Sequence, residues 1–266
     1  MVKVYTIASG KGGTGKTTVS VNLGTMLAKL GKETYLMDAD IGMANVGLIL
    51  GLQDAPVTLH EILAGKNNID EGIYPGPAGL KVIPSGISLQ GFQQADPDKI
   101  RDVMSEIVKR CEFLLIDAPA GISKDGVVPL AIADEVILVV NPELSSIVDA
   151  LKTKILTEVV GGHVIGSIIN RVDQDRSDVI AKKMEKVLGV KVLGIIPEDT
   201  NVRRAAAARS PIVITYPDSP ASKAIHRIAA DIIGVAYKDD TPAAAARESF
   251  IDRFSKALFK KKSEQK

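Results

Sequence analysis

The segment from Gly10 to Thr17 combines glycine, lysine and threonine in a spacing that suits phosphate binding. It reads Gly-Lys-Gly-Gly-Thr-Gly-Lys-Thr and lies between a β-branched apolar run and a helical pattern, which is the context that a phosphate loop requires. Glycines let backbone N–H groups face phosphate oxygens, and the helix beginning near Lys16 adds its positive end. Lys16 is expected to contact the β- and γ-phosphates, and the Thr17 hydroxyl to ligate Mg²⁺. The alternative is a glycine-rich turn without a ligand.

Acidic side chains follow two further apolar runs. Asp38 and Asp40 come at the end of the run that begins at Thr34, and Asp117 ends the run Phe113–Asp117. Two neighbouring carboxylates are costly in a purely buried role because like charges repel. Beside a metal ion and an attacking water they are useful, so the sequence favours a magnesium-dependent site.

A second lysine, Lys11, distinguishes this loop from an ordinary phosphate loop, which needs one. A solvated loop lysine is one interpretation, and a second cation for developing charge is the other. The run Lys-Gly-Gly-Thr-Gly-Lys-Thr-Thr resembles the deviant Walker A motif of the MinD/ParA ATPase family. The resemblance implies ATP and Mg²⁺ as ligands, ATP hydrolysis, and a face-to-face homodimer in which Lys11 reaches the nucleotide of the partner subunit.

The resemblance also implies the roles of other residues. Asp40 would position the attacking water, Asp38 would lie near the metal, and Asp117 would hold Mg²⁺ through water. Lys11, Lys16 and Asp40 are therefore the expected catalytic residues, and Thr17, Asp38 and Asp117 the expected metal site. By the same resemblance, the ends of two strands would enclose the adenine base, with ordinary turns as the alternative. Residues expected to bind the nucleotide are those of the loop, one switch residue and five at these two strand ends: Gly10, Lys11, Gly12, Gly13, Thr14, Gly15, Lys16, Thr17, Thr18, Asn45, Asn170, Arg171, Pro197, Glu198 and Asp199.

Within the family the chain is most similar to the MinD group, particularly its archaeal members. This similarity lies in three short segments: Asp-Ala-Asp-Ile-Gly-Met-Ala-Asn at residues 38–45, Asp-Ala-Pro-Ala-Gly at 117–121, and Asn-Pro-Glu-Leu-Ser-Ser at 141–146. Iron–sulfur relatives need several cluster cysteines, and this chain has one, Cys111. On the helix after Asn-Pro-Glu, Glu143, Ser145 and Asp149 match the partner-binding face of bacterial members, whereas Leu151 replaces an acidic residue. This replacement argues against a partner of the bacterial type.

Strand and helix patterns alternate up to about residue 235, which predicts βαβ units and an α/β fold. The expected architecture is a doubly wound, mostly parallel sheet with helices on both faces, and its ligands lie beyond the carboxyl ends of the strands. The predicted strands are Val2–Ser9, Thr34–Asp38, Leu80–Ser85, Phe113–Asp117, Glu135–Val140, Val164–Asn170 and Lys191–Pro197. The predicted helices are Lys16–Leu30, Pro97–Arg110, Leu144–Val160, Ser177–Leu188 and Pro220–Ile233, with start signals at Asp96-Pro97 and Ser219-Pro220.

Composition excludes several classes of protein. The 266 residues are 45% hydrophobic and 24% charged, as in a soluble globular protein, and the net charge of +1 gives no global field for nucleic acid. No apolar run approaches the ~18–20 residues that a membrane span needs. No signal peptide precedes the phosphate loop, so a cytoplasmic protein is expected.

The last residues have a different pattern. Residues 1–237 are expected to form the ATPase domain, 238–248 a flexible linker, and 249–266 an amphipathic helix with a basic tail. Five apolar residues share an arc of about 120°, namely Phe250, Ile251, Phe254, Ala257 and Leu258. The expected membrane contacts are the four large side chains of this stripe and Phe259, which lies off it. Residues 248–266 hold six Lys/Arg against three Asp/Glu. A Phe/Leu face beside a basic face is typical of a helix at a membrane interface, here one with anionic lipid. The alternative is a helix that docks on the domain or on another protein.

These patterns predict an ATP-dependent dimerising switch that cycles between the cytoplasm and the inner face of the cell membrane. By resemblance it would position cell-division or other polar or surface machinery, with an unidentified protein as activator or cargo. The alternative is a ParA-type ATPase in DNA or cargo partitioning, for which Arg203, Arg204 and Arg209 are the basic cluster. Nucleic acid is the less expected partner, because DNA contact needs charge rather than a phenylalanine face. A scaffold that binds nucleotide without hydrolysis is a third option, which Lys11 and Asp40 argue against.

Overall fold

The computed structural model describes residues 2–86, 95–96, 99–121, 129–131, 135–173 and 177–237. The predicted linker and C-terminal amphipathic helix, residues 238–266, lie outside this part of the chain, as does the predicted helix start at Pro97. Within the described ranges, no helix is both long and apolar enough to span a bilayer.

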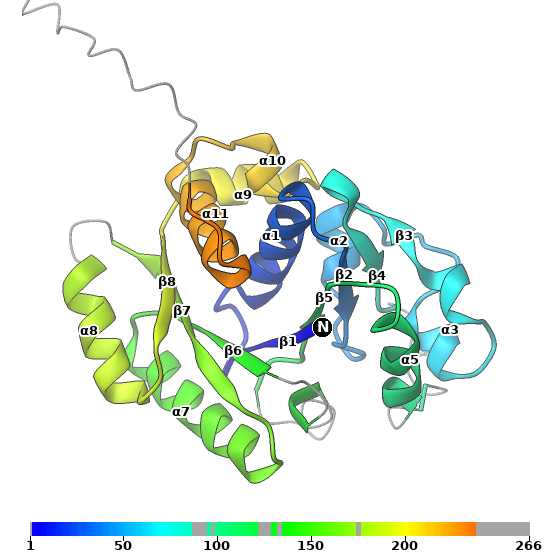
Figure 1. Ribbon diagram of the computed structural model, residues 1–266, viewed down its shortest axis with the longest axis horizontal. Helices are drawn as coiled ribbons and strands as arrows, with labels where there is room; N and C mark the ends of the chain where they lie inside the picture. Colours follow the sequence, from blue (N-terminus) through cyan, green and yellow to red (C-terminus); the bar gives the residue numbers. More distant parts are fainter. Residues whose placement is uncertain are drawn as a thin grey trace, which may run out of the picture.

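A single eight-stranded sheet forms the centre of the molecule, in the order β3-β4-β2-β5-β1-β6-β7-β8 (Figure 1). The strands are β1 Lys3–Ala8, β2 Thr34–Asp38, β3 Tyr74–Pro75, β4 Lys81–Ile83, β5 Phe113–Asp117, β6 Glu135–Val140, β7 Val164–Val172 and β8 Val192–Pro197. All neighbouring pairs are parallel except β3 with β4. The central strands β2 and β5 are buried throughout, as expected for a sheet covered on both faces.

Helices cover the two faces of this sheet and enclose two apolar cores (Figure 1). One face carries α1 Lys16–Lys29, α2 Val46–Leu50, α9 Thr200–Ala207, α10 Ile212–Thr215 and α11 Pro220–Ile233. The other carries α3 Leu59–Leu63, α5 Ile100–Ile107, α7 Leu144–Val159 and α8 Ser177–Leu188. Short 3₁₀ turns, η1 Ile69–Gly72 and η2 Pro77–Gly79, connect the segments around β3. The predicted doubly wound α/β fold is confirmed.

The sequence patterns located the long elements well and missed the short ones. β2, β5 and β6 have the predicted bounds, and α8 and α11 do too. The Ser219 side chain caps α11 by accepting a hydrogen bond from Ser222 N at 3.3 Å. The sequence analysis did not predict α2, α3, α9 and α10, each of eight residues or fewer, because so short a helix shows little apolar periodicity.

Candidate nucleotide-binding site

The phosphate loop connects the end of β1 to the start of α1, as the sequence predicted. Gly13 and Gly15 have φ angles of 80° and 90°, a backbone conformation that side chains with a Cβ rarely adopt. Gly15 directly precedes α1 and has no side chain to cap it, so the first N–H groups of the helix keep their capacity to bind an anion. The side-chain oxygen of Thr14 is buried without a hydrogen-bond partner. The loop thus ends at an uncapped helix N-terminus beside a buried hydroxyl without a partner.

Lys16 and Thr17 both contact Asp117, the last residue of β5. Lys16 Nζ lies 2.9 Å from Asp117 Oδ1, and the Thr17 hydroxyl donates to Asp117 Oδ2 at 2.7 Å. The Lys16 side chain is 6% exposed and that of Asp117 is fully buried. Ser20, one turn along α1, places its Oγ 2.7 Å from Asp117 Oδ1. Four side chains from two neighbouring elements therefore converge where a phosphate-bound metal ion would lie.

The segment between β2 and α2, residues 38–45, folds around the carboxylate of Asp38. The two Asp38 oxygens accept hydrogen bonds from the backbone N–H groups of Asp40, Asn45 and Val46, at 3.0–3.1 Å. Burial, with nearby Asp117, raises the Asp38 pKa to about 7, although the N–H donors of Val46 and Asp40 and the charge of Lys16 act in the opposite direction. A divalent cation beside the two carboxylates would relieve their repulsion.

Asp40 and Asn45 lie on this same segment, here called the switch loop (residues 38–45). Asp40 is half-buried, and its Oδ1 accepts from Met43 N at 2.9 Å. Asn45 is exposed and donates from Nδ2 to the Met43 carbonyl at 2.6 Å. The structure therefore brings both predicted switch residues next to Asp38, whereas their predicted roles in hydrolysis stay predictions.

Lys11 has surroundings unlike those of Lys16. Its Nζ lies 3.0 Å from Glu143 Oε2 and 2.9 Å from Ser145 Oγ, where α7 begins. The Lys11 side chain is 31% exposed and that of Glu143 is 61% exposed. One loop thus carries a lysine turned into the site and a lysine turned toward the surface.

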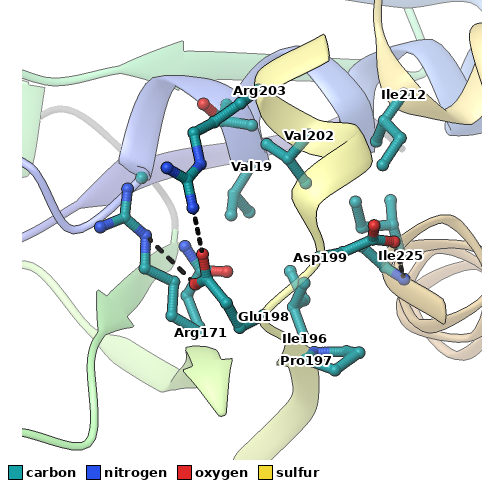
Figure 2. Close-up of a pocket in the computed structure, with 14 residues that line it drawn as sticks. Val19, Arg171, Ile196, Pro197, Glu198, Asp199, Val202, Arg203, Ile212 and Ile225 are labelled. Atoms are coloured by element: carbon teal, nitrogen blue, oxygen red, sulfur yellow. Dashed lines mark hydrogen bonds and ion pairs between the residues drawn. The ribbon is translucent and has the colours of Figure 1, made fainter. Parts of the chain in front are cut away.

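A cavity of about 270 Å³ adjoins the start of α1, between the ends of β7 and β8. All five residues predicted to enclose the base line it, namely Asn170, Arg171, Pro197, Glu198 and Asp199. Its apolar wall comes from Val19, Ile196, Val202, Ile212 and Ile225 (Figure 2). A mostly apolar cavity of this size with polar groups among its lining residues suits a purine base.

Charged side chains form the rim of this cavity. Arg171 and Arg203 each place a nitrogen 3.8 Å from a carboxylate oxygen of Glu198, so that Glu198 lies between two guanidinium groups (Figure 2). Arg171 adopts a positive φ of 57° at an irregular step between β7 and β8. Asp199 instead points toward α11 (Figure 2), and its carboxylate accepts from Asn201 N at 2.9 Å, which caps α9, and from Ala221 N at 3.3 Å. Neighbouring residues of this segment thus have different partners, Glu198 two arginines and Asp199 two helix N-termini.

Asn170 does more than line the cavity. Its Nδ2 donates to the carbonyl of Thr14 at 2.7 Å, which ties the end of β7 to the phosphate loop. A Cβ on Gly15 would collide with the same nitrogen. The sequence analysis assigned Asn170 only to the base, and it missed Ser20, Val19, Val202, Arg203, Ile212 and Ile225. For Ser20 a signal was available, since it follows Lys16 by four residues and so shares its helix face.

Mg²⁺ in nucleotide sites keeps several waters and takes few ligands from the protein. The described residues contain no cluster of three or more His, Cys, Asp or Glu able to hold a metal by themselves. The Thr17 hydroxyl, the Asp117 carboxylate, and the paired Asp38 carboxylate instead fit an ion held jointly with phosphate. The orphaned Thr14 hydroxyl and the free amides of the loop fit the phosphates themselves.

The fold and this site define a P-loop nucleotide-binding protein of the α/β class. Comparison with known families makes this specific: the chain belongs to the family of CobQ/CobB/MinD/ParA nucleotide-binding domains, whose model matches residues 5–212. An uncharacterized ATP-binding protein of Methanocaldococcus jannaschii is 50% identical over 259 residues, which cover 97% of each chain.

Solved structures of MinD proteins resemble the whole described domain. The cell division ATPase MinD of Pyrococcus furiosus has a TM-score of 0.82 and 36% identity, covering 89% of this chain and 100% of that one. The septum site-determining protein MinD of Pyrococcus horikoshii, complexed with Mg-ADP, has a TM-score of 0.81 and 33% identity, covering 87% and 96%. The protein is thus a MinD-like P-loop ATPase whose ligands are ATP and Mg²⁺.

Proposed function

We propose that this protein is an ATP-driven switch that dimerises around bound ATP, binds a membrane while dimeric, and leaves it after hydrolysis. The observation that carries the proposal is the different environment of the two loop lysines. Lys16 is buried at its own nucleotide site, whereas Lys11 is held at the surface by Glu143 and Ser145. A lysine at the surface of a phosphate loop is available to a second nucleotide only if another subunit presents one.

In the proposed reaction, the chain's own residues bind the phosphates and orient water. The loop amides and Lys16 hold the β- and γ-phosphates, and Thr17, Asp117 and Asp38 would hold the metal. Mg²⁺, when bound, neutralises charge on the phosphate oxygens. Asp40 orients a water for in-line attack on the γ-phosphorus, the bond to the bridging oxygen breaks, and Lys11 of the partner subunit stabilises the charge that develops.

The membrane step is proposed from the sequence of residues 249–266, which lie outside the described residues. Burying Phe250, Ile251, Phe254 and Leu258 contributes about 1.5–3 kcal/mol for each fully buried side chain. Much of this offsets the cost of ordering a short helix. One such helix binds the membrane weakly, whereas a dimer binds it through two helices at once. Because ATP favours the dimer, ATP binding and hydrolysis would move the protein between the cytoplasm and the inner face of the membrane. Positioning of division or other surface machinery is the corresponding cellular role, with an activator or cargo protein as a further partner.

The dimer is tested with two lysine variants. Lys11→Ala should bind ATP as a monomer yet lose ATP-dependent dimerisation and most turnover, whereas Lys16→Ala should lose nucleotide affinity itself. Size-exclusion chromatography with light scattering, with and without Mg-ATP, measures the first property, and equilibrium nucleotide binding measures the second. A Lys11→Ala protein that dimerises and hydrolyses ATP normally would contradict the proposal.

The membrane step is tested by sedimentation with anionic vesicles. Full-length protein should pellet with Mg-ATP and pellet less with ADP or high salt, because each basic residue adds roughly 1 kcal/mol that salt screens. Deletion of residues 249–266, or Phe254→Glu, should abolish pelleting and leave basal hydrolysis intact. Binding to DNA fragments in place of vesicles would instead favour a partitioning ATPase.

A further inference from the structure

A buried histidine contacts the switch loop from outside the nucleotide site. His60, the second residue of α3, is 1% exposed, and its Nε2 lies 2.8 Å from the carbonyl oxygen of Ile41. Ile41 is itself buried and directly follows Asp40, so the contact lies one peptide from the carboxylate that we assign to water positioning.

The partner atoms determine the state of the imidazole ring. A carbonyl oxygen only accepts, so Nε2 must carry the proton and donate it. Nδ1 is buried and has no hydrogen-bond partner. A Cβ on Gly86 would collide with Nδ1 and lie 2.7 Å from Thr58 Oγ, so the Gly86 backbone packs closely against this edge of the ring. Nε2 of His60 therefore donates to the Ile41 carbonyl at 2.8 Å, and Ser85 Oγ is a second polar neighbour of Nε2 at 3.5 Å.

The helix that carries His60 is itself anchored to the sheet. Leu59 N donates to the carbonyl of Pro84 at 2.9 Å, which binds the start of α3 to the chain leaving β4. The side chains of Leu59 and Ile62 pack with that of Ile41 in the core on this face. His60 is therefore carried by a helix that a backbone hydrogen bond and core packing hold in place.

Asp40 is fixed on both sides by these contacts. Its own N–H donates to Asp38 Oδ1 at 3.1 Å, and the carbonyl of the next residue, Ile41, accepts from His60. The contact of Asp40 N depends on Asp38, a residue of the expected metal site, whereas the contact between His60 and the Ile41 carbonyl does not. The backbone that carries Asp40 is therefore held between the nucleotide site and a support outside it.

We propose that His60 is a positioning residue for hydrolysis, whose Nε2–H donor holds the Ile41 carbonyl and so sets the place of the Asp40 carboxylate. This role rests on the proposed function, in which Asp40 orients the attacking water. It predicts an effect on turnover rather than on nucleotide affinity, because His60 lies outside the set of residues around the phosphates and the base cavity.

The test replaces His60 by three side chains of different donor geometry. Gln places an amide nitrogen near the position of Nε2, Asn places one near Nδ1, and Leu provides none. His60→Leu and His60→Asn should lower kcat about 10- to 100-fold with KM changed less than about threefold, as expected for a displaced catalytic group. His60→Gln should retain kcat within about fivefold. His163→Leu, at an exposed histidine before β7, is the matched control and should behave as wild type.

Equilibrium binding of a fluorescent ATP analogue and thermal unfolding are measured for every variant. Equal turnover of the Gln and Asn variants, whether high or low, would overturn the proposal, because position of the donor would not matter. This comparison holds even if His60→Leu fails to fold. Long-range ¹H–¹⁵N spectra of histidine-labelled wild type supply a second check, since an Nδ1–H tautomer at His60 would also overturn it. Normal turnover of Asp40→Ala would instead refute the assignment of Asp40, and with it the role of His60.

Discussion

Gly10, the first residue of the phosphate loop, lies against the backbone of α7. A Cβ added at Gly10 would be 2.6 Å from Ala150 N and still closer to the carbonyl group of Asp149, whereas a Cβ at Gly12 would meet nothing within 4 Å. Neither glycine has a positive φ, so alanine is conformationally acceptable at both. Gly10→Ala and Gly12→Ala therefore differ mainly in one steric contact between the loop and α7.

The size of the effect follows from that contact. Cβ atoms essentially never approach a heavy atom closer than 3.0 Å, so the loop and α7 must move apart, and both are backbone. Overpacking of this kind costs about 1–3 kcal/mol. At ~2–4 °C per kcal/mol for a domain of this size, Tm of Gly10→Ala should fall by roughly 2–12 °C. Displacement of the loop should also weaken Mg-ADP binding about tenfold or more.

Thermal unfolding and calorimetric titration with Mg-ADP measure the two properties on both variants. Gly12→Ala should melt within about 2 °C of wild type, since an exposed position without contacts changes stability by about 0.5 kcal/mol or less. The reasoning would be refuted by a Gly10→Ala protein that melts and binds ADP as Gly12→Ala does.

Three other predictions concern the carboxylates and Lys11. Ser20→Ala removes a donor to Asp117 and should raise the Mg²⁺ concentration for half-maximal hydrolysis about 10-fold. An unchanged Mg²⁺ requirement would show that Ser20 does not orient Asp117 for the metal. Because burial and Asp117 raise the pKa of Asp38 to about 7 in the fold, apo protein should lose stability as pH rises from ~4 to 7, by roughly 4 kcal/mol from this group. Asp38→Asn should remove that part of the pH dependence, as unfolding at pH 5 and 7.5 would show. Glu143→Gln should release Lys11 and strengthen ATP-dependent dimerisation up to about fivefold in sedimentation equilibrium, since an exposed ion pair contributes ~0.2–1 kcal/mol. Weaker dimerisation of this variant would indicate that Glu143 supports the dimer instead.

Local patterns and one general rule were enough to predict that the acidic strand ends share one site, and the strand order shows which of them are neighbours. Asp117 lies beside Lys16 because β5 pairs with both β1 and β2. The sequence placed each carboxylate at a strand end, and the general rule for parallel sheets brings such ends together. The prediction of a shared metal site therefore needed only local patterns and one rule.

The phosphate loop, the Asp38 and Asp117 strand ends and the alternating α/β pattern were determined by the sequence alone. Phosphates are bound by contiguous backbone, and long strands and helices leave a periodic signal, so local residues are sufficient to predict them. Only the tertiary structure revealed that Asn170 holds the Thr14 carbonyl, that Lys11 reaches Glu143, and that His60 holds the switch loop. Each of these joins segments remote in the chain through one side-chain atom, and such pairings arise from how the layers pack rather than from any pattern along the sequence.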